Sequence, residues 1–163
     1  MNPSVSIIIG SMSDWDVMKN CAAMLDKFGV SYERNVASAH RTPAKACEIA
    51  STAKARGVKV IIAAAGGAAH LAGVLASQTP LPILGVPMVG WATDGMDSLL
   101  STVQMPRGVP VMTLAIGKAG AVNAAIAAVQ ILALSDDTLA QKLVDFRKKQ
   151  TEEVLALKFP DEK

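Results

Sequence analysis

Hydrophobic residues along this chain fall into short runs rich in β-branched residues and longer runs rich in alanine. The short runs predict five strands, at residues 4–9, 31–37, 58–65, 82–88 and 109–116. The longer runs carry apolar residues at helical spacing and predict helices at 18–28, 43–57, 69–77, 96–103, 118–134 and 138–157. Strands that alternate with helices are typical of βα units around a parallel sheet, so the pattern predicts an α/β protein.

The order of the strands follows from general rules of chain connection. Right-handed crossovers and short connections favour the order 2-1-3-4-5, which is that of flavodoxin-like sheets. The first, third and fifth strands are apolar nearly throughout, as is typical of strands that helices cover on both faces. We therefore predict a single domain over residues 1–163, a three-layer sandwich with a central parallel sheet and a C-terminal helical extension.

The last two predicted helices have more apolar surface than one small domain can cover. The helix at 118–134 is apolar or small around nearly its whole circumference, and the amphipathic helix at 138–157 has no strand of its own to cover. Ser135 or Asp136 can cap the second of these helices. We expect a homo-oligomer in which residues 135–163 form a terminal helix that packs on neighbouring subunits.

Composition narrows the class of protein. Hydrophobic residues make up 51% of the 163 residues, and no apolar run approaches the roughly 18 residues of a membrane span. A net charge of +2 and 4% aromatic residues offer little to a nucleic acid. Cys21 and Cys47 lack metal-ligand spacing, so we expect neither a metal site nor a disulfide. We expect a soluble protein without membrane or nucleic-acid partners, and in the absence of a recognisable signal peptide a cytoplasmic one.

Three polar segments follow the first three predicted strands. They are "GSMSD" (10–14), "SAHRTP" (38–43) and "GGAAHL" (66–71). In the order 2-1-3 these strands are neighbours, so the segments should line one rim of the sheet, where ligands bind in such folds. Both histidines of the chain, His40 and His70, lie in these segments.

The first and third of these segments each allow two interpretations. The hydroxyls of Ser11 and Ser13 stand beside free N–H groups at a helix start and suit a phosphate, although Ser-x-x-Asp is also a capping box. Asp14 would repel a phosphate and is better suited to ribose hydroxyls. Gly66 and Gly67 let a planar ring approach the backbone, although a tight turn explains the same two glycines.

The second segment carries the strongest chemical signal. The imidazole of His40 has an ordinary pKa suited to proton transfer near neutral pH, and the guanidinium of Arg41 can fork onto a phosphate or carboxylate. Thr42 as cap and Pro43 as first residue would start the next helix. The sequence contains no ATP-binding loop, GxGxxG motif, recognised triad or acidic cluster. The expected chemistry therefore needs a proton carrier and neither cofactor nor metal.

With "VQMPRGVPV" (103–111) and "AIGKAGAVNAA" (115–125), these segments resemble the class I N5-carboxyaminoimidazole ribonucleotide mutases of bacterial purine biosynthesis. The resemblance covers nearly the whole chain. It implies a flavodoxin-like fold and a homo-octamer with active sites near subunit boundaries. It also implies a reaction that moves a carboxylate from the exocyclic nitrogen of an aminoimidazole ribonucleotide to the adjacent ring carbon, without ATP, metal or biotin.

The same resemblance implies roles for single residues. His40 would be the general acid and base. The substrate-binding residues would be Ser11, Ser13 and Arg41 for the phosphate, Asp14 for the ribose, and Ser38, Gly66, Gly67, Ala68 and His70 for the carboxyimidazole. The segment "VGWATDG" (89–95) departs from the Ser/Ala-rich turn that is commoner in the family, so the packing of Trp91 stays open.

Three alternatives differ in the residues that they require. The class II relatives carboxylate aminoimidazole ribonucleotide directly with CO₂, and their motif "SAHKGP" differs from this chain at Arg41 and Thr42. A flavodoxin-like electron carrier needs aromatic partners for its flavin and leaves His40 unexplained. A receiver domain needs a phosphorylatable Asp at the end of the third strand, where this chain has Ala65 and Gly66.

Overall fold

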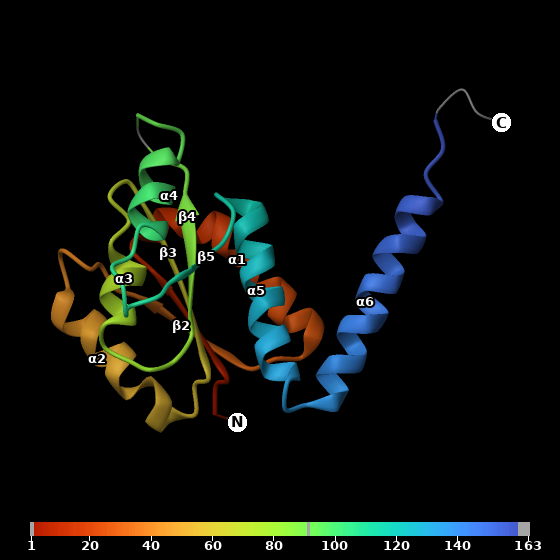
Figure 1. The fold of residues 1–163 in the computed structure, drawn as a ribbon, viewed down its shortest axis with the longest axis horizontal. Coiled ribbons are helices and arrows are strands. Elements are labelled where there is room, and N and C mark those ends of the chain that lie inside the picture. Colours follow the sequence, from red (N-terminus) through yellow and green to blue (C-terminus); the bar gives the residue numbers. More distant parts are fainter. Residues whose placement is uncertain (1, 91, 160–163) are drawn as a thin grey trace.

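The structure of the chain, a computed structural model, describes residues 2–90 and 92–159. In these residues, helices lie on both sides of a five-stranded sheet (Figure 1). The strands are β1 (Val5–Ile9), β2 (Tyr32–Val36), β3 (Val60–Gly66), β4 (Ile83–Met88) and β5 (Met112–Thr113). All neighbouring strands are parallel and the order is β2-β1-β3-β4-β5, which confirms the predicted fold class and topology.

The helices and the two apolar layers follow the predicted alternation. The helices are α1 (Trp15–Phe28), α2 (Pro43–Ala53), α3 (Leu71–Ala76), α4 (Met96–Val103), α5 (Lys118–Ala133) and α6 (Asp137–Leu155), with short 3-10 helices η1 (Met12–Asp14) and η2 (Lys54–Arg56). Ile7 and Ile62 face the layer of α1 and α5, whereas Ile8 and Ile61 face α2 and α3. Because both faces are covered, the central strands are buried over nearly their whole length.

The fifth strand is shorter than the sequence predicts. Instead of residues 109–116, only Met112 and Thr113 form β5, and Met112 is 46% exposed. The prediction that this strand is covered on both faces was therefore wrong. Pro110 has no N–H to donate, and β5 is an edge strand that pairs with β4 alone. After β5 the chain keeps single bonds to β4, from the Leu114 N–H to the Gly85 carbonyl and from the Gly117 N–H to the Pro87 carbonyl, both at 2.9 Å, without a continuous ladder.

The last two helices pack on their own chain along only part of their surface. α5 buries a stripe of small residues such as Ala121, Ala124 and Ala128, while Gln130 on its other side is exposed. Full burial of α5 therefore requires contacts from outside the single chain. The predicted cap of α6 is confirmed at Asp136, whose Oδ1 accepts the Leu139 N–H at 3.1 Å.

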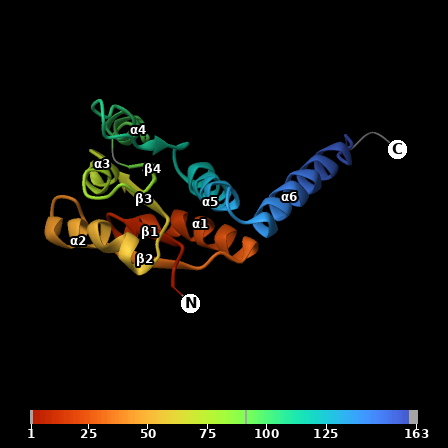
Figure 2. The same cartoon turned by 60° about the horizontal axis from the view of Figure 1, so that its bottom comes forward.

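α6 begins against α5 and the carboxyl end of α1 and then leaves the body of the molecule (Figures 1 and 2). Lys142 Nζ donates to the Phe28 carbonyl at 2.8 Å, and the rings of Phe28 and Phe146 pack edge to face. Farther along the helix, Val154 and Leu155 are 66% and 80% exposed. Among the helices of the described residues, none is both long and apolar enough to cross a membrane.

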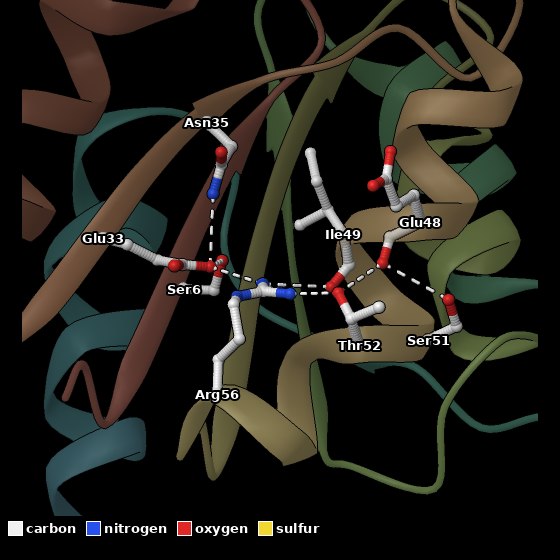
Figure 3. A network of polar contacts seen from close by, with 8 residues as sticks. All are labelled: Ser6, Glu33, Asn35, Glu48, Ile49, Ser51, Thr52 and Arg56. Carbon is white, nitrogen blue, oxygen red and sulfur yellow. Dashed lines mark hydrogen bonds and ion pairs between the residues drawn. The ribbon is translucent and has the colours of Figure 1, made fainter.

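A polar network ties β1, β2 and the end of α2 together (Figure 3). Glu33 Oε1 accepts hydrogen bonds from Ser6 Oγ at 2.9 Å, Arg56 Nη2 at 2.8 Å and Asn35 Nδ2 at 3.3 Å. Arg56 also donates to Thr52 Oγ1, and to the Ile49 carbonyl at 3.1 Å. Partial burial by itself would raise the pKa of Glu33, but the hydrogen bonds from Arg56 and Ser6 outweigh it and hold this pKa below its usual value.

Candidate active site

A cleft of about 610 Å³ opens at the carboxyl ends of β1, β2 and β3, and all three predicted segments meet there. Its lining residues are Gly10, Ser11, Ser13, Asp14, Ser38, Ala39, His40, Arg41, Ala65, Gly66, Ala68, His70, Leu71, Val89 and Gly90. The predicted convergence on one rim is thus confirmed, because parallel strands end at one edge of the sheet. Gly67 is the one predicted site residue outside this lining, and it is buried.

Three lining residues lie outside the three predicted segments, namely Ala65 of β3 and the pair Val89 and Gly90. Val89 and Gly90 directly follow β4, whose neighbour in the sheet is β3. The available signal was the strand order itself, which places the end of β4 beside the end of β3. Valine has an apolar side chain and glycine has none, so neither residue type indicates a chemical role in the sequence. Trp91, the next residue, lies outside the described residues.

Ser11 and Ser13 form a compact pair of hydroxyls at the start of the first helical segment. Ser11 Oγ accepts from the Ser13 hydroxyl at 2.9 Å and from the Ser13 N–H at 3.3 Å. The side chain of Ser11 therefore caps η1 through the Ser13 N–H. In a capping box it would accept from the Asp14 N–H, but that group donates to the backbone carbonyl of Ser11 at 3.1 Å. Both hydroxyls line the cleft, where they can donate to an anion.

Asp14 lies beside this pair and is half-buried. Burial raises the pKa of its carboxyl above the ordinary value, while the Ser11 backbone and the Ser13 side chain act in the opposite direction. A carboxylate in this position is an acceptor for hydroxyl groups and repels a phosphate. The cleft therefore has one acidic point beside its hydroxyl pair.

The two histidines contact each other inside the cleft. His40 Nε2 lies 2.8 Å from His70 Nδ1, and the rings meet edge to face with centroids 4.9 Å apart. In this contact one ring must donate a proton and the other must accept it. Because only one of the two facing nitrogens can carry the shared proton, the contact couples the tautomer of His40 to that of His70 and holds the two rings in one mutual orientation.

Arg41 bridges two of the three segments. Its Nη2 donates to the Gly10 carbonyl at 3.4 Å, and its Nε and backbone N–H donate to Ser38 Oγ at 3.4 and 3.2 Å. Pro43 is the first residue of α2, as predicted. Thr42 makes no side-chain cap, contrary to the prediction, because its hydroxyl turns back to bond with the Ser38 N–H at 2.8 Å and the Ser38 carbonyl at 3.2 Å.

The third segment is a turn between β3 and α3. Gly67 has a φ of 64°, in the left-handed region that favours glycine. A Cβ on Gly66 would lie 3.5 Å from Met88 Cβ, so the backbone of this turn sits close against β4. The turn therefore presents backbone groups to the cleft without side chains in front of them, apart from those of Ala68 and His70.

The chemistry of the lining residues restricts what the cleft can hold. In residues 2–90 and 92–159 no group of three or more His, Cys, Asp or Glu side chains converges as metal ligands would. None of the described lining residues is Phe, Tyr or Trp, which are the usual stacking partners of a flavin ring. The arrangement offers hydroxyl and guanidinium donors, one carboxylate and a pair of imidazoles.

Fold and cleft together define a flavodoxin-like α/β protein with a polar ligand site at the carboxyl ends of its strands. The model of the AIR carboxylase family matches residues 4–153, so the chain belongs to this family.

Three similar proteins share the name N5-carboxyaminoimidazole ribonucleotide mutase. The one from Vibrio parahaemolyticus is 60% identical over 97% of this chain and 98% of its own length. The Bacillus subtilis protein is 57% identical over 95% and 96%, and the Escherichia coli protein 55% identical over 94% and 92%. A crystal structure of Treponema denticola PurE matches 94% of each chain with a TM-score of 0.84 at 24% identity, and this likeness supports the fold.

Proposed function

We propose that this chain converts N5-carboxyaminoimidazole ribonucleotide into 4-carboxy-5-aminoimidazole ribonucleotide, a step of de novo purine biosynthesis. The observation that carries the proposal is identity of 54–60% over nearly the full chain to relatives that are named for this reaction. The cleft supports it, since it offers separate groups for an anion, for hydroxyls and for proton transfer.

The proposed placement of the substrate follows the chemistry of the cleft. Ser11, Ser13 and Arg41 bind the phosphate, because hydroxyl and guanidinium donors converge there. Asp14 accepts hydrogen bonds from the ribose. The carboxyimidazole lies between Ser38 and the turn of Gly66, Gly67, Ala68 and His70, where the backbone is accessible.

His40 acts in both halves of the proposed reaction. It first donates a proton to the exocyclic nitrogen while the N–C bond of the carbamate breaks, which yields aminoimidazole ribonucleotide and CO₂. The ring carbon then attacks the confined CO₂, and His40 takes the proton that this carbon loses. The enzyme thus ends in its starting protonation state, and His70, at 2.8 Å, keeps the ring of His40 aligned.

An absorbance assay with an isotope label tests the reaction and separates it from direct carboxylation. The purified chain is given N5-carboxyaminoimidazole ribonucleotide in buffer that contains ¹⁴C-bicarbonate, without ATP or metal, and product is followed in the near ultraviolet. The mutase forms product that carries little label. Heavily labelled product, together with product from aminoimidazole ribonucleotide and bicarbonate alone, would establish the class II reaction. No product from either substrate would overturn the proposal.

We also propose that the chain works as a homo-oligomer, an octamer as in the family it resembles, in the cytoplasm where its phosphorylated substrate is made. The partly covered α5 and the exposed Val154 and Leu155 of α6 support this. Val154→Asp combined with Leu155→Asp should lower the mass in light scattering, whereas Lys149→Asp on the same helix should not. An unchanged mass in the double variant would contradict a role of this end of α6 in assembly.

A further inference from the structure

The turn of residues 66–70 is held both by a bond of its own and by a bond from a neighbouring helix. Within it, the His70 N–H donates to the Ala68 carbonyl at 2.9 Å. The neighbouring N–H of Ala69 donates instead to the hydroxyl of Ser101 in α4, at 2.9 Å. Ala69 is 1% exposed, so this donor has no access to bulk water. The direction of the Ala69 peptide, between two residues of the cleft, therefore depends on α4.

The hydroxyl of Ser101 donates its proton within its own helix, which leaves its oxygen lone pairs available to accept the Ala69 N–H. Its shortest contact as a donor is with the Asp97 carbonyl, at 2.7 Å, one turn earlier in the same helix. The Ser98 and Gly67 carbonyls lie farther away, at 3.3 and 3.4 Å. The single hydroxyl proton thus goes to Asp97, and the lone pairs face Ala69. Bonds in such a chain polarise and strengthen one another.

α4 itself is fixed to the end of β4. The fully buried hydroxyl of Ser98 lies 2.7 Å from the Met88 carbonyl and 2.8 Å from the Gly95 carbonyl, and these two acceptors share its single proton. Thr102 Oγ1 donates to the Ser98 carbonyl at 2.7 Å and lies 3.4 Å from the Ala69 carbonyl. A hydroxyl on a helix that is anchored in this way is a rigid acceptor for the turn.

We propose that Ser101 is a positioning residue for the reaction, which acts through the Ala69 N–H on the turn that holds the carboxyimidazole. It does not touch the substrate. It holds the Ala69 peptide so that Ala68 and His70 keep their places in the cleft, and through His70 it also affects the alignment of His40. This inference rests on the proposed function, because it assumes that the turn contacts the reacting end of the substrate.

Ser101→Ala tests the role directly. Removal of the acceptor leaves the buried Ala69 N–H unpaired, so the turn must shift, and kcat should fall roughly tenfold to a hundredfold. The inhibition constant of ribose 5-phosphate, which would occupy only the phosphate and ribose end of the cleft, should stay within about twofold of wild type. Ser101→Thr keeps a hydroxyl and should recover most of kcat.

Ser98→Ala is the matched control, because it removes a buried hydroxyl from the same helix without a bond to the turn. It should lower the melting temperature while kcat of the folded enzyme stays within about threefold. An equal fall of kcat in both variants would reduce Ser101 to a structural residue. Wild-type kcat in folded Ser101→Ala would overturn the proposal outright, whereas an inactive wild type would contradict the proposed function instead.

Hydrogen exchange of the wild-type protein decides the matter if Ser101→Ala does not fold. The Ala69 amide should exchange far more slowly than the amide of the exposed Ala68, and Ser101→Thr should preserve this protection. Rapid exchange of the Ala69 amide in the wild type would show that the bond to Ser101 is not maintained in solution, and the proposal would fail.

Discussion

Two polar clusters lie at opposite ends of α2, and they use similar side chains in opposite ways. Beyond its carboxyl end, Glu33 and Arg56 form short bonds and are only partly exposed (Figure 3). Before its amino end, His40 and Arg41 are exposed in the cleft, and the side-chain bonds of Arg41 are 3.4 Å long.

The difference lies in how many bonds each cluster has left to make. One oxygen of Glu33 already accepts three hydrogen bonds, so this cluster has little capacity for a ligand and serves the stability of the fold. The guanidinium of Arg41 has five N–H donors, and its long contacts are easily exchanged for shorter bonds to an anion. Changes in the first cluster should therefore alter stability, and changes in the second should alter activity.

The largest effect is expected for His40→Asn. Asparagine keeps part of the size and polarity of imidazole but cannot carry the proton, so kcat should fall at least roughly 100-fold. Nucleotide affinity, measured by titration calorimetry on the same preparation, should change little, and the melting temperature should be unaffected because His40 is exposed. Substantial remaining activity would assign the proton transfer to another group, and lost affinity with normal kcat would make His40 a binding residue.

Glu33→Gln should show the opposite behaviour. At pH 7 the free energy of unfolding should fall by roughly 1–3 kcal/mol, since bonds to a charged group are lost, while kcat of the folded enzyme stays the same. The folded pKa of Glu33 is lowered, so its contribution is present above the ordinary value of 4.5 and is lost as the pH falls through the folded pKa.

Urea denaturation at a series of pH values measures this contribution. The difference in the free energy of unfolding between wild type and Glu33→Gln should be large at neutral pH and should vanish in acid. Glu48→Gln, on the exposed side of α2, is the matched control and should leave both curves nearly superimposed. A gap that does not depend on pH would mean that the charge of Glu33 is unimportant and only its packing matters.

Arg41→Lys should weaken substrate binding without unfolding the protein. A single ammonium cannot reproduce the bonds of the guanidinium fork, so KM should rise about tenfold with little change in kcat. Arg34→Lys provides the control, because Arg34 stacks over Trp15 and is not among the residues that line the main cleft. An unchanged KM in steady-state assays of Arg41→Lys would remove Arg41 from the phosphate site.

The smallest effect is expected for Asp14→Asn. Burial raises the pKa of this carboxyl, so its ionised form opposes folding at pH 7, and the opposition disappears as the pH falls below the ordinary value of 3.8. The variant should melt slightly higher than wild type at pH 7 and equally in acid, with KM a few-fold higher. Asp16→Asn, at an exposed position, is the control and should change neither the melting temperature nor KM. A lower melting temperature of Asp14→Asn at pH 7 would refute the burial argument.

Much of the fold was accessible to sequence reasoning because it depends on local and general rules. Apolar runs such as residues 58–65 predict buried strands, and the handedness of crossovers leaves few possible strand orders. The place of the cleft followed from this order, since the segments that carry Ser11, His40 and His70 all begin where strands end. These features need no knowledge of which side chains touch.

The parts that sequence reasoning missed depend on competition between partners that only the folded chain brings together. Thr42 has the right type and position for a cap, yet its hydroxyl finds a better partner in Ser38. The stretch 109–116 has the composition of a strand, but at the edge of the sheet only one neighbour is available to hold it.

The sequence by itself therefore determined the fold class, the strand order and the three polar segments at the rim, because periodicity and chain connection are properties of the chain alone. Only the tertiary structure decided that His40 meets His70 and that Ser101 holds the turn beside them. Each of these bonds joins residues about thirty positions apart, whose distance and orientation depend on the packing of whole helices against the sheet. In the sequence, Ser101 does not differ from other serines in predicted helices, and its role became visible only through the hydrogen bond from the Ala69 N–H.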